Sequence, residues 1–342
     1  MLRYDKTTQA DFVDEGEDGT LDAIIAALED LPEAKPYSRE YQRIFSPAEK
    51  RVDFAAVEKA LDSDAVKTDL ALRVPIRKVL DDLIALMRNQ DKAGGITQSF
   101  VQSLTLTTGP EAQKILGEYL LGIWRKGREL AAGELPVKLK DKIRKFAGLE
   151  PTQAINFFQN LRPWLIKGII DDELKKTARL ELTEHLKGGR TLTETIGNLR
   201  SAWEPWIGDP TKVIPSGISG TPEDILQAYR LENIIRTEVI GALSQGRAEI
   251  GDEAGDFVVG YELSPVLDER TSEICNRIGD LQESDRPVMF RKDDPRAEKL
   301  MPALHYQCRT IPVFITQDDL PVRWSTEAEL DSVLRLIPQG FK

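Results

Sequence analysis

The sequence predicts a mostly helical α+β protein, in which a long helical body precedes a small α/β or β-hairpin C-terminal domain. Aromatic residues make up only 7% of the 342 residues, whereas Ala, Leu and Glu are frequent, a composition that favours helices. Apolar residues recur at helical spacing over much of the chain up to residue 250. After Gly255 the pattern changes to two short β-rich runs, which predict a small sheet near the C-terminus.

Composition and charge exclude several classes of protein. Hydrophobic residues at 41% and charged residues at 30% are typical of a folded chain and exclude wholesale disorder. Two cysteines and two histidines exclude a Cys-rich zinc array. The chain has no run of about 20 apolar residues, so no membrane span is expected. The net charge of −11 argues against DNA binding as the main activity.

We expect three parts: an acidic arm with a short helix over residues 1–50, a helical body over 51–205 and a C-terminal domain over 206–342. Residues 1–31 contain nine acidic and two basic residues and so carry −7 of the net charge of −11. Such a segment is either a flexible, solvated arm or a peptide that docks on a basic partner surface.

Periodicity and breaker residues place the helices of the body. A helical pattern runs over residues 53–89, and Pro75 is expected to kink or divide it. A later pattern over residues 151–187 predicts another helix. Breaker residues predict the remaining boundaries: a turn at Gly94-Gly95, a start at Gly109-Pro110, an end at Pro136, an interruption near Pro163 and an end at Gly188-Gly189.

Two further helices follow before the sheet. Thr191 or Thr193 can cap the first of them, and residues 206–221 then read as a loop because they are rich in Gly and Pro. Thr221-Pro222 predicts the start of a long helix over residues 222–250, since a capping threonine, a proline and acidic residues stand in its first turn.

The C-terminal domain contains both cysteines and one of the two histidines. Cys275 lies between the predicted strands at residues 257–263 and 310–315, and His305-x-x-Cys308 begins 30 residues after it. Three soft ligands could hold one structural zinc ion, with Asp268, Asp280 or water as the fourth ligand. Two reduced cysteines beside a hydrogen-bonded histidine, or a Cys275–Cys308 disulfide, are the alternatives.

One stretch of the body is basic. It could face phosphates or an acidic partner, or it could be an ordinary solvated helix face. Its cations are Arg125, Lys126, Arg128, Lys138, Lys140, Lys142, Arg144 and Lys145.

Residues 267–280, 304–309 and 310–315 resemble the tail pattern of the phage head morphogenesis family, the minor head proteins related to phage Mu protein F. The matching positions also include the glycine-containing run at residues 186–192 and an Arg-Thr-Glu run in the long helix, with Gly246-Arg247 shortly after it. Together the matches cover about residues 180–318. Ser272 stands where the family has the first cysteine of a Cys-x-x-Cys. The motif positions are Arg236, Thr237, Glu238, Asp268, Arg270, Thr271, Gly279 and Arg309.

The resemblance implies a structural minor head protein of a tailed bacteriophage, without catalysis. Its implied partners are the portal protein, the scaffold or major capsid protein, and packaged DNA through the basic stretch. It implies a protein made in the host cytoplasm and carried in the virion, with no membrane partner and no small-molecule substrate. In many relatives a metal holds the C-terminal hairpin. Because Ser272 replaces one of the family's cysteines, the resemblance implies for this chain either one structural zinc or no cofactor.

Two acidic motifs have alternative interpretations. Glu327 and Glu329 resemble, at a distance, the Glu-x-Glu of ADP-ribosyltransferases, and this enzyme is the alternative function. The same segment also reads as a helix start capped by its Ser325-Thr326 pair. In the long helix, we expect Glu232 to pair with Arg236, in an Arg–Glu lattice that orients the helix against the hairpin domain.

Overall fold

The computed structural model describes residues 51–53, 56–57, 63–139, 143, 152–188, 190–207, 230–265, 273–279, 287–305 and 308–338. The acidic arm over residues 1–50 and most of the loop over 206–221 lie outside these ranges. Residues 43–342 form one compact unit, and the expected division between residues 205 and 206 stays a prediction. No described helix is long and apolar enough to cross a membrane.

The described residues form a mostly helical α+β fold with one three-stranded antiparallel sheet, as the sequence predicts. The strands are β1 (Val258–Pro265), β2 (Met289–Arg291) and β3 (Thr310–Thr316), in the order β2-β1-β3. The principal helices are α3 (Ala65–Lys92), α4 (Gln98–Ser103), α5 (Gly109–Glu134), α7 (Thr152–Asn156), α8 (Arg162–Leu186), α9 (Leu192–Ile207), α11 (Arg230–Glu253), α12 (Glu273–Gly279), α13 (Ala297–Leu300) and α14 (Glu327–Leu336).

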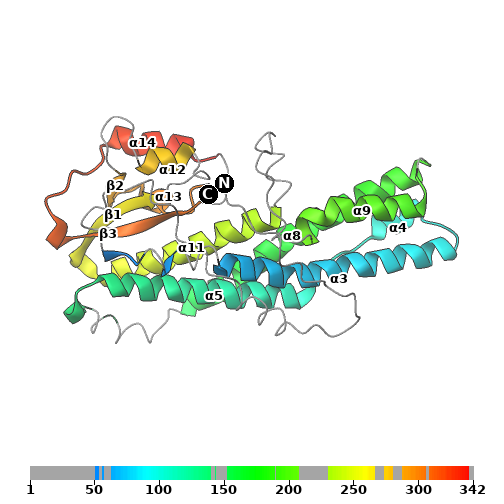
Figure 1. Ribbon diagram of the computed structural model, residues 1–342, viewed down its shortest axis with the longest axis horizontal. Coiled ribbons are helices and arrows are strands. Elements are labelled where there is room, and N and C mark those ends of the chain that lie inside the picture. The colour runs from blue at the N-terminus through cyan, green and yellow to red at the C-terminus, as the bar shows by residue number, and fades with distance from the viewer. Residues whose placement is uncertain are drawn as a thin grey trace, which may run out of the picture. The chain divides into compact units, whose positions relative to one another are not determined.

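Helix α11 packs against β3 on one side of the sheet, while α12 contacts β1 and α14 on the other side (Figure 1). Both strands of the central pair are therefore almost fully buried, including the polar residues Glu262 and Ser264 of β1. In their register Tyr261 faces Phe314 and Phe290, and its ring lies 6.1 and 5.7 Å from theirs. This aromatic cluster forms the centre of the small sheet's core.

Most of the helix boundaries follow the local signals. Helix α5 begins at Gly109, which has a positive φ of 73°, and ends at Glu134, two residues before Pro136. The Thr191 hydroxyl accepts a hydrogen bond from the Glu194 amide and so caps α9. The helix predicted over residues 222–250 is confirmed from Arg230, where its description begins, and continues to Glu253.

Two prolines behave differently from one another. Pro75 does not divide its helix, because α3 continues through it, and the alternative expectation of a kink at Pro75 stays a prediction. Pro75 is itself buried between the buried residues Leu72 and Ile76, and this packing offsets the backbone hydrogen bond that proline cannot form. The interruption expected near Pro163 is observed as a π-helical segment, η3 (Phe157–Leu161), directly before α8.

Helices α5 and α11 approach so closely that their backbones touch. A Cβ atom on Gly127 would lie 2.2 Å from the Leu243 carbonyl oxygen, and one on Gly246 would lie 2.2 Å from that of Trp124. Trp124 of α5 lies beside Gly246 of α11, and Gly127 lies beside Leu243. Residue numbers thus rise along α5 as they fall along α11, so the two helices run antiparallel. Glycine is required at both positions because any side chain would force the helices apart.

Candidate functional site

The predicted cluster of two cysteines and a histidine is present. Cys275 lies on α12, whereas His305 and Cys308 lie in the segment that leads into β3. The ligand atoms of all three residues lie within 4.8 Å of one another, and all three side chains are buried. The sheet and α12 thus bring together residues that are 30 positions apart in the sequence.

Hydrogen bonds organise this cluster around Cys275. Its Sγ lies 2.9 Å from His305 Nε2 and 3.2 Å from the Oγ1 of Thr310, the first residue of β3. The backbone amide of Cys308 donates to the His305 carbonyl over 3.3 Å. Thr310 is fully buried and was missed by the sequence analysis, since a threonine at the start of a strand carries no local signal of such a contact.

The two thiols differ in acidity. The hydrogen bond from Cys308, helped by the hydrogen bond and charge of His305, lowers the pKa of Cys275 to about 4 against the opposing effect of burial. Burial, followed by the interaction with Cys275, raises the pKa of Cys308 well above its usual range. The two pKa shifts run in opposite directions, as expected where Cys308 donates its thiol proton to the sulfur of Cys275.

The donor set fits zinc, because two sulfur atoms and one imidazole nitrogen are the ligands that structural zinc sites use. Both thiols are free, so the alternative of a Cys275–Cys308 disulfide is not what the structure contains. The proposed fourth ligands, Asp268 and Asp280, lie outside the described residues. Zinc would supply a covalent-like link between α12 and the start of β3.

The Arg-Thr-Glu run lies on α11, and its glutamate binds a residue of the helical body. Glu238 accepts two hydrogen bonds of 2.6 Å from the Nε and Nη2 atoms of Arg162, the first residue of α8. This bidentate pair ties α11 to the helical body. The Arg–Glu lattice expected between this helix and the hairpin domain stays a prediction, because the side chain of Glu232 lies outside the described residues.

Arg247 makes the contact with the sheet instead. Its Nε donates to the Pro312 carbonyl of β3 over 2.9 Å, and its Nη2 donates to the carboxylate of Glu134 over 2.8 Å. Both side chains are almost fully buried, and burial raises the pKa of Glu134 against the attraction of Arg247. The sequence did contain a signal for this buried contact: Arg247 follows Leu243 by four residues, which places a charged side chain on the apolar face of the predicted helix.

The four described cations of the basic stretch do not form one open cationic surface. Arg128 is buried, binds Glu249 and Glu253 at 2.8 and 2.7 Å, and lies over the Trp124 ring. Lys126 binds Asp64 at 3.1 Å. These two residues are therefore removed from the predicted phosphate-facing patch, because their charges are satisfied within the protein. Arg125 and Lys138 are exposed; the members outside the described residues are Lys140, Lys142, Arg144 and Lys145.

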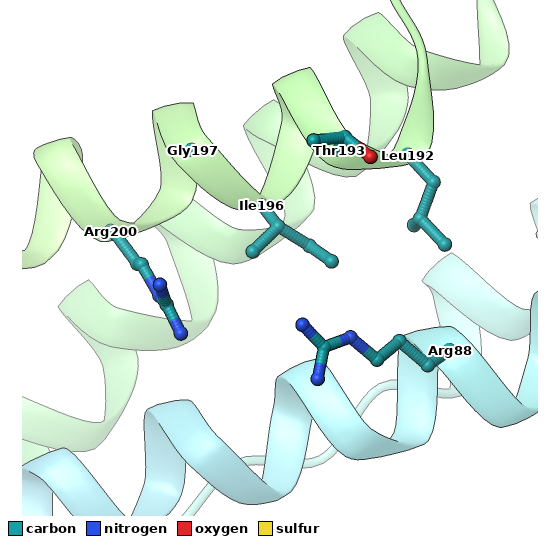
Figure 2. A pocket seen from close by; sticks show the side chains of 6 residues that line it. All are labelled: Arg88, Leu192, Thr193, Ile196, Gly197 and Arg200. Carbon is teal, nitrogen blue, oxygen red and sulfur yellow. The ribbon is translucent and has the colours of Figure 1, made fainter.

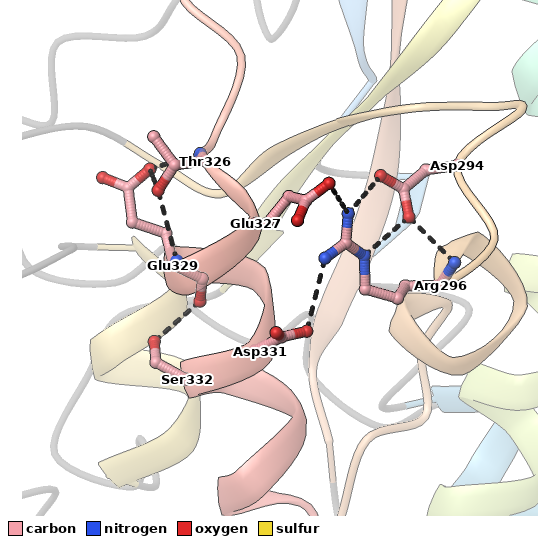
Figure 3. A network of polar contacts seen from close by, with 7 residues as sticks. All are labelled: Asp294, Arg296, Thr326, Glu327, Glu329, Asp331 and Ser332. Carbon is pink, nitrogen blue, oxygen red and sulfur yellow. Dashed lines mark hydrogen bonds and ion pairs between the residues drawn. The ribbon is translucent and has the colours of Figure 1, made fainter.

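The Glu-x-Glu segment begins α14, as the capping interpretation predicts (Figure 3). The Glu329 carboxylate accepts a hydrogen bond of 2.6 Å from the Thr326 amide, and the Glu329 amide donates to the Thr326 hydroxyl. Glu327 lies 3.9 Å from Arg296, which also binds Asp294. Helix capping and a surface ion pair thus account for both carboxylates.

The remaining motif residues are placed only in part. Gly279 is the last residue of α12, and Arg309 lies half-buried directly before β3. Asp268, Arg270 and Thr271 lie outside the described residues. Comparisons with protein-family models, with curated proteins and with solved structures found no match to this chain.

Proposed function

We propose that this chain is a structural minor head protein of a tailed bacteriophage, which binds portal and capsid components during head morphogenesis. The proposal rests on one observation: the segments that resemble this family pack against one another in the fold. Helix α11, with Arg236, Thr237 and Glu238, packs against β3, and α12 with Cys275 packs against β1. Segments spread over about 80 positions thus form one packed unit, as a shared structural motif requires.

An exposed apolar strip on α8 supports a role in assembly. The strip comprises Trp164, Leu165 and Ile169 of α8 together with Leu161, the last residue of η3, and their spacing places them on one face. Trp164 and Ile169 are 60% and 49% exposed. The opposite face of α8 is buried in the core. Contiguous exposed apolar side chains mark surfaces that a partner protein covers, and we assign this strip to contact with the portal protein.

Substitutions on this strip test the assignment. Trp164→Glu combined with Ile169→Glu should reduce the amount of protein incorporated into particles by about tenfold or more, since anchor residues dominate an interface. Leu180→Glu is the matched control, because Leu180 is 60% exposed on the same helix but lies outside the strip. Equal incorporation of the double variant and the control would contradict the assignment.

A structural zinc ion at Cys275, His305 and Cys308 is the finer part of this proposal, and the donor set supports it. The role assigned to zinc is to hold α12 against the start of β3, so that the C-terminal unit is a rigid element. Metal analysis of the protein purified without added chelator should find one zinc per chain, and chelation should lower the melting temperature. An identical melting temperature with and without chelator would overturn the zinc site.

A further inference from the structure

A cleft of about 320 Å³ lies between α3 and α9 (Figure 2). Its volume is at the lower end of the range that small-molecule sites occupy. Arg88 lines it from α3, and the residues that line it from α9 are Leu192, Thr193, Ile196, Gly197 and Arg200. Of these positions the sequence analysis singled out only Thr193, as a candidate helix cap.

The two arginines that line the cleft extend into the same space. Figure 2 shows the guanidinium groups of Arg88 and Arg200 facing the gap between the two helices, on either side of Ile196. Among the described residues, neither group has an ion-pair or hydrogen-bond partner. Other arginines of the helices bind carboxylates, as Arg162 and Arg247 do. Two converging, unpaired guanidinium groups are a ready site for an anion that accepts several hydrogen bonds.

The rest of the lining restricts the kind of anion. Leu192 and Ile196 supply an apolar wall, whereas Thr193 supplies a hydroxyl in the first turn of α9, the positive end of a 16-residue helix. Gly197 has no atom within 4 Å of the position that a Cβ would occupy, so the cleft stays open there. A phosphate ion alone would leave most of this space and the apolar wall without contact.

We propose that this cleft binds an organic phosphate. The phosphate group lies between Arg88 and Arg200, where the two guanidinium forks donate to its oxygens. The organic part packs on Leu192 and Ile196, whose apolar surface is removed from water on binding. This site is independent of the proposed role in head assembly, which requires no small-molecule ligand.

Isothermal titration calorimetry of the full chain with phenyl phosphate tests the site. We expect saturable binding of one phenyl phosphate per chain, and weaker binding of inorganic phosphate, which lacks the apolar part. Arg88→Gln and Arg200→Gln should each weaken phenyl phosphate binding by about tenfold or more, since each removes charge-assisted hydrogen bonds. Lys78→Gln is the matched control, because it removes an exposed cation of α3 outside the cleft and should leave the affinity unchanged.

A fourth variant separates loss of binding from loss of folding. Gly197→Leu should abolish binding by filling the cleft, while the better helix propensity of leucine favours the folded state. No saturable binding of phenyl phosphate up to roughly 10 mM would overturn the proposal, because a weaker interaction is not a specific site. Undiminished binding by both arginine variants would also overturn it, as would arginine-dependent binding of a duplex DNA oligonucleotide without any binding of phenyl phosphate.

Discussion

Arg247 and Glu134 form a buried ion pair with 2.8 Å between Nη1 and Oε1, and it joins the middle of α11 to the last residue of α5. The same guanidinium donates to the Pro312 carbonyl, so one side chain connects two helices and the sheet. This connection joins the helical body to the C-terminal sheet within the apolar core that they share. Substitution of Arg247 therefore tests this part of the fold at a single residue.

Arg247→Met should lower the free energy of unfolding by roughly 3–5 kcal/mol, because it leaves the Glu134 carboxylate buried without its partner. The double variant Arg247→Met with Glu134→Leu should recover more than half of that loss, since no uncompensated charge remains. Chemical denaturation of the three proteins measures both effects. A double variant that is less stable than Arg247→Met would contradict this explanation.

The close approach of α5 and α11 gives a second prediction. Gly246→Ala should be strongly destabilising, by several kcal/mol, because its Cβ would collide with the Trp124 carbonyl and neither backbone can move without separating the helices. Gly122→Ala on α5 is the control, since nothing lies within 4 Å of its Cβ position. It should stabilise the protein by roughly 0.5–1 kcal/mol through helix propensity, as thermal unfolding can measure. Equal effects of the two substitutions would exclude the tight contact.

The acidity of Cys275 predicts a pH dependence in the metal-free protein. With its pKa lowered to about 4 and that of Cys308 raised, the folded pair binds one proton between pH 4 and the ordinary thiol range near 9, where the unfolded chain binds two. The free energy of unfolding should therefore rise with pH across this window, and the contribution should be lost as the pH falls through about 4.

Thiolate absorbance measures the same property directly. The metal-free wild-type protein should show one thiolate at pH 7, and Cys275→Ser should show none. Cys308→Ala should raise the pH at which the thiolate forms, because it removes the hydrogen bond that contributes most to the low pKa of Cys275. A wild-type protein without thiolate absorbance at pH 7 would show that the cluster does not hold its proton in this way.

The cap of α14 separates the structural interpretation of Glu329 from the enzymatic one. Thr326→Ala should cost roughly 1 kcal/mol of stability, because the Glu329 amide loses its hydrogen-bond acceptor. Glu329→Gln should cost less, since glutamine can still accept from the Thr326 amide. Differential scanning calorimetry measures these losses. Specific NAD binding that disappears in Glu329→Gln would instead favour the transferase.

The sequence predicted the features that depend on neighbouring residues. Gly109-Pro110, Pro136, Thr191 and Thr326 act within one helical turn, and the helices begin and end where these residues indicate. The cysteine cluster could be predicted because only three soft ligands occur in the C-terminal domain.

The features that sequence reasoning missed depend on distant partners. In the sequence, Arg128 belongs to a basic stretch. In the fold it is buried and binds Glu249, which lies 121 residues further along the chain. Pro75 predicted a kink or a division of its helix. Helix α3 is continuous through Pro75, where the residues on both sides of it are packed. Arg88 and Arg200 lie on different helices, so nothing in the local pattern of either one indicates the cleft they share.

The central claim is that the chain is a minor component of a phage head, and quantitative mass spectrometry of purified particles tests it most directly. The particles are those of the phage or induced prophage that encodes the chain. We predict a low copy number per particle in a fixed ratio to the portal protein. Absence of the chain from particles, together with normal particles when its gene is deleted, would contradict the claim.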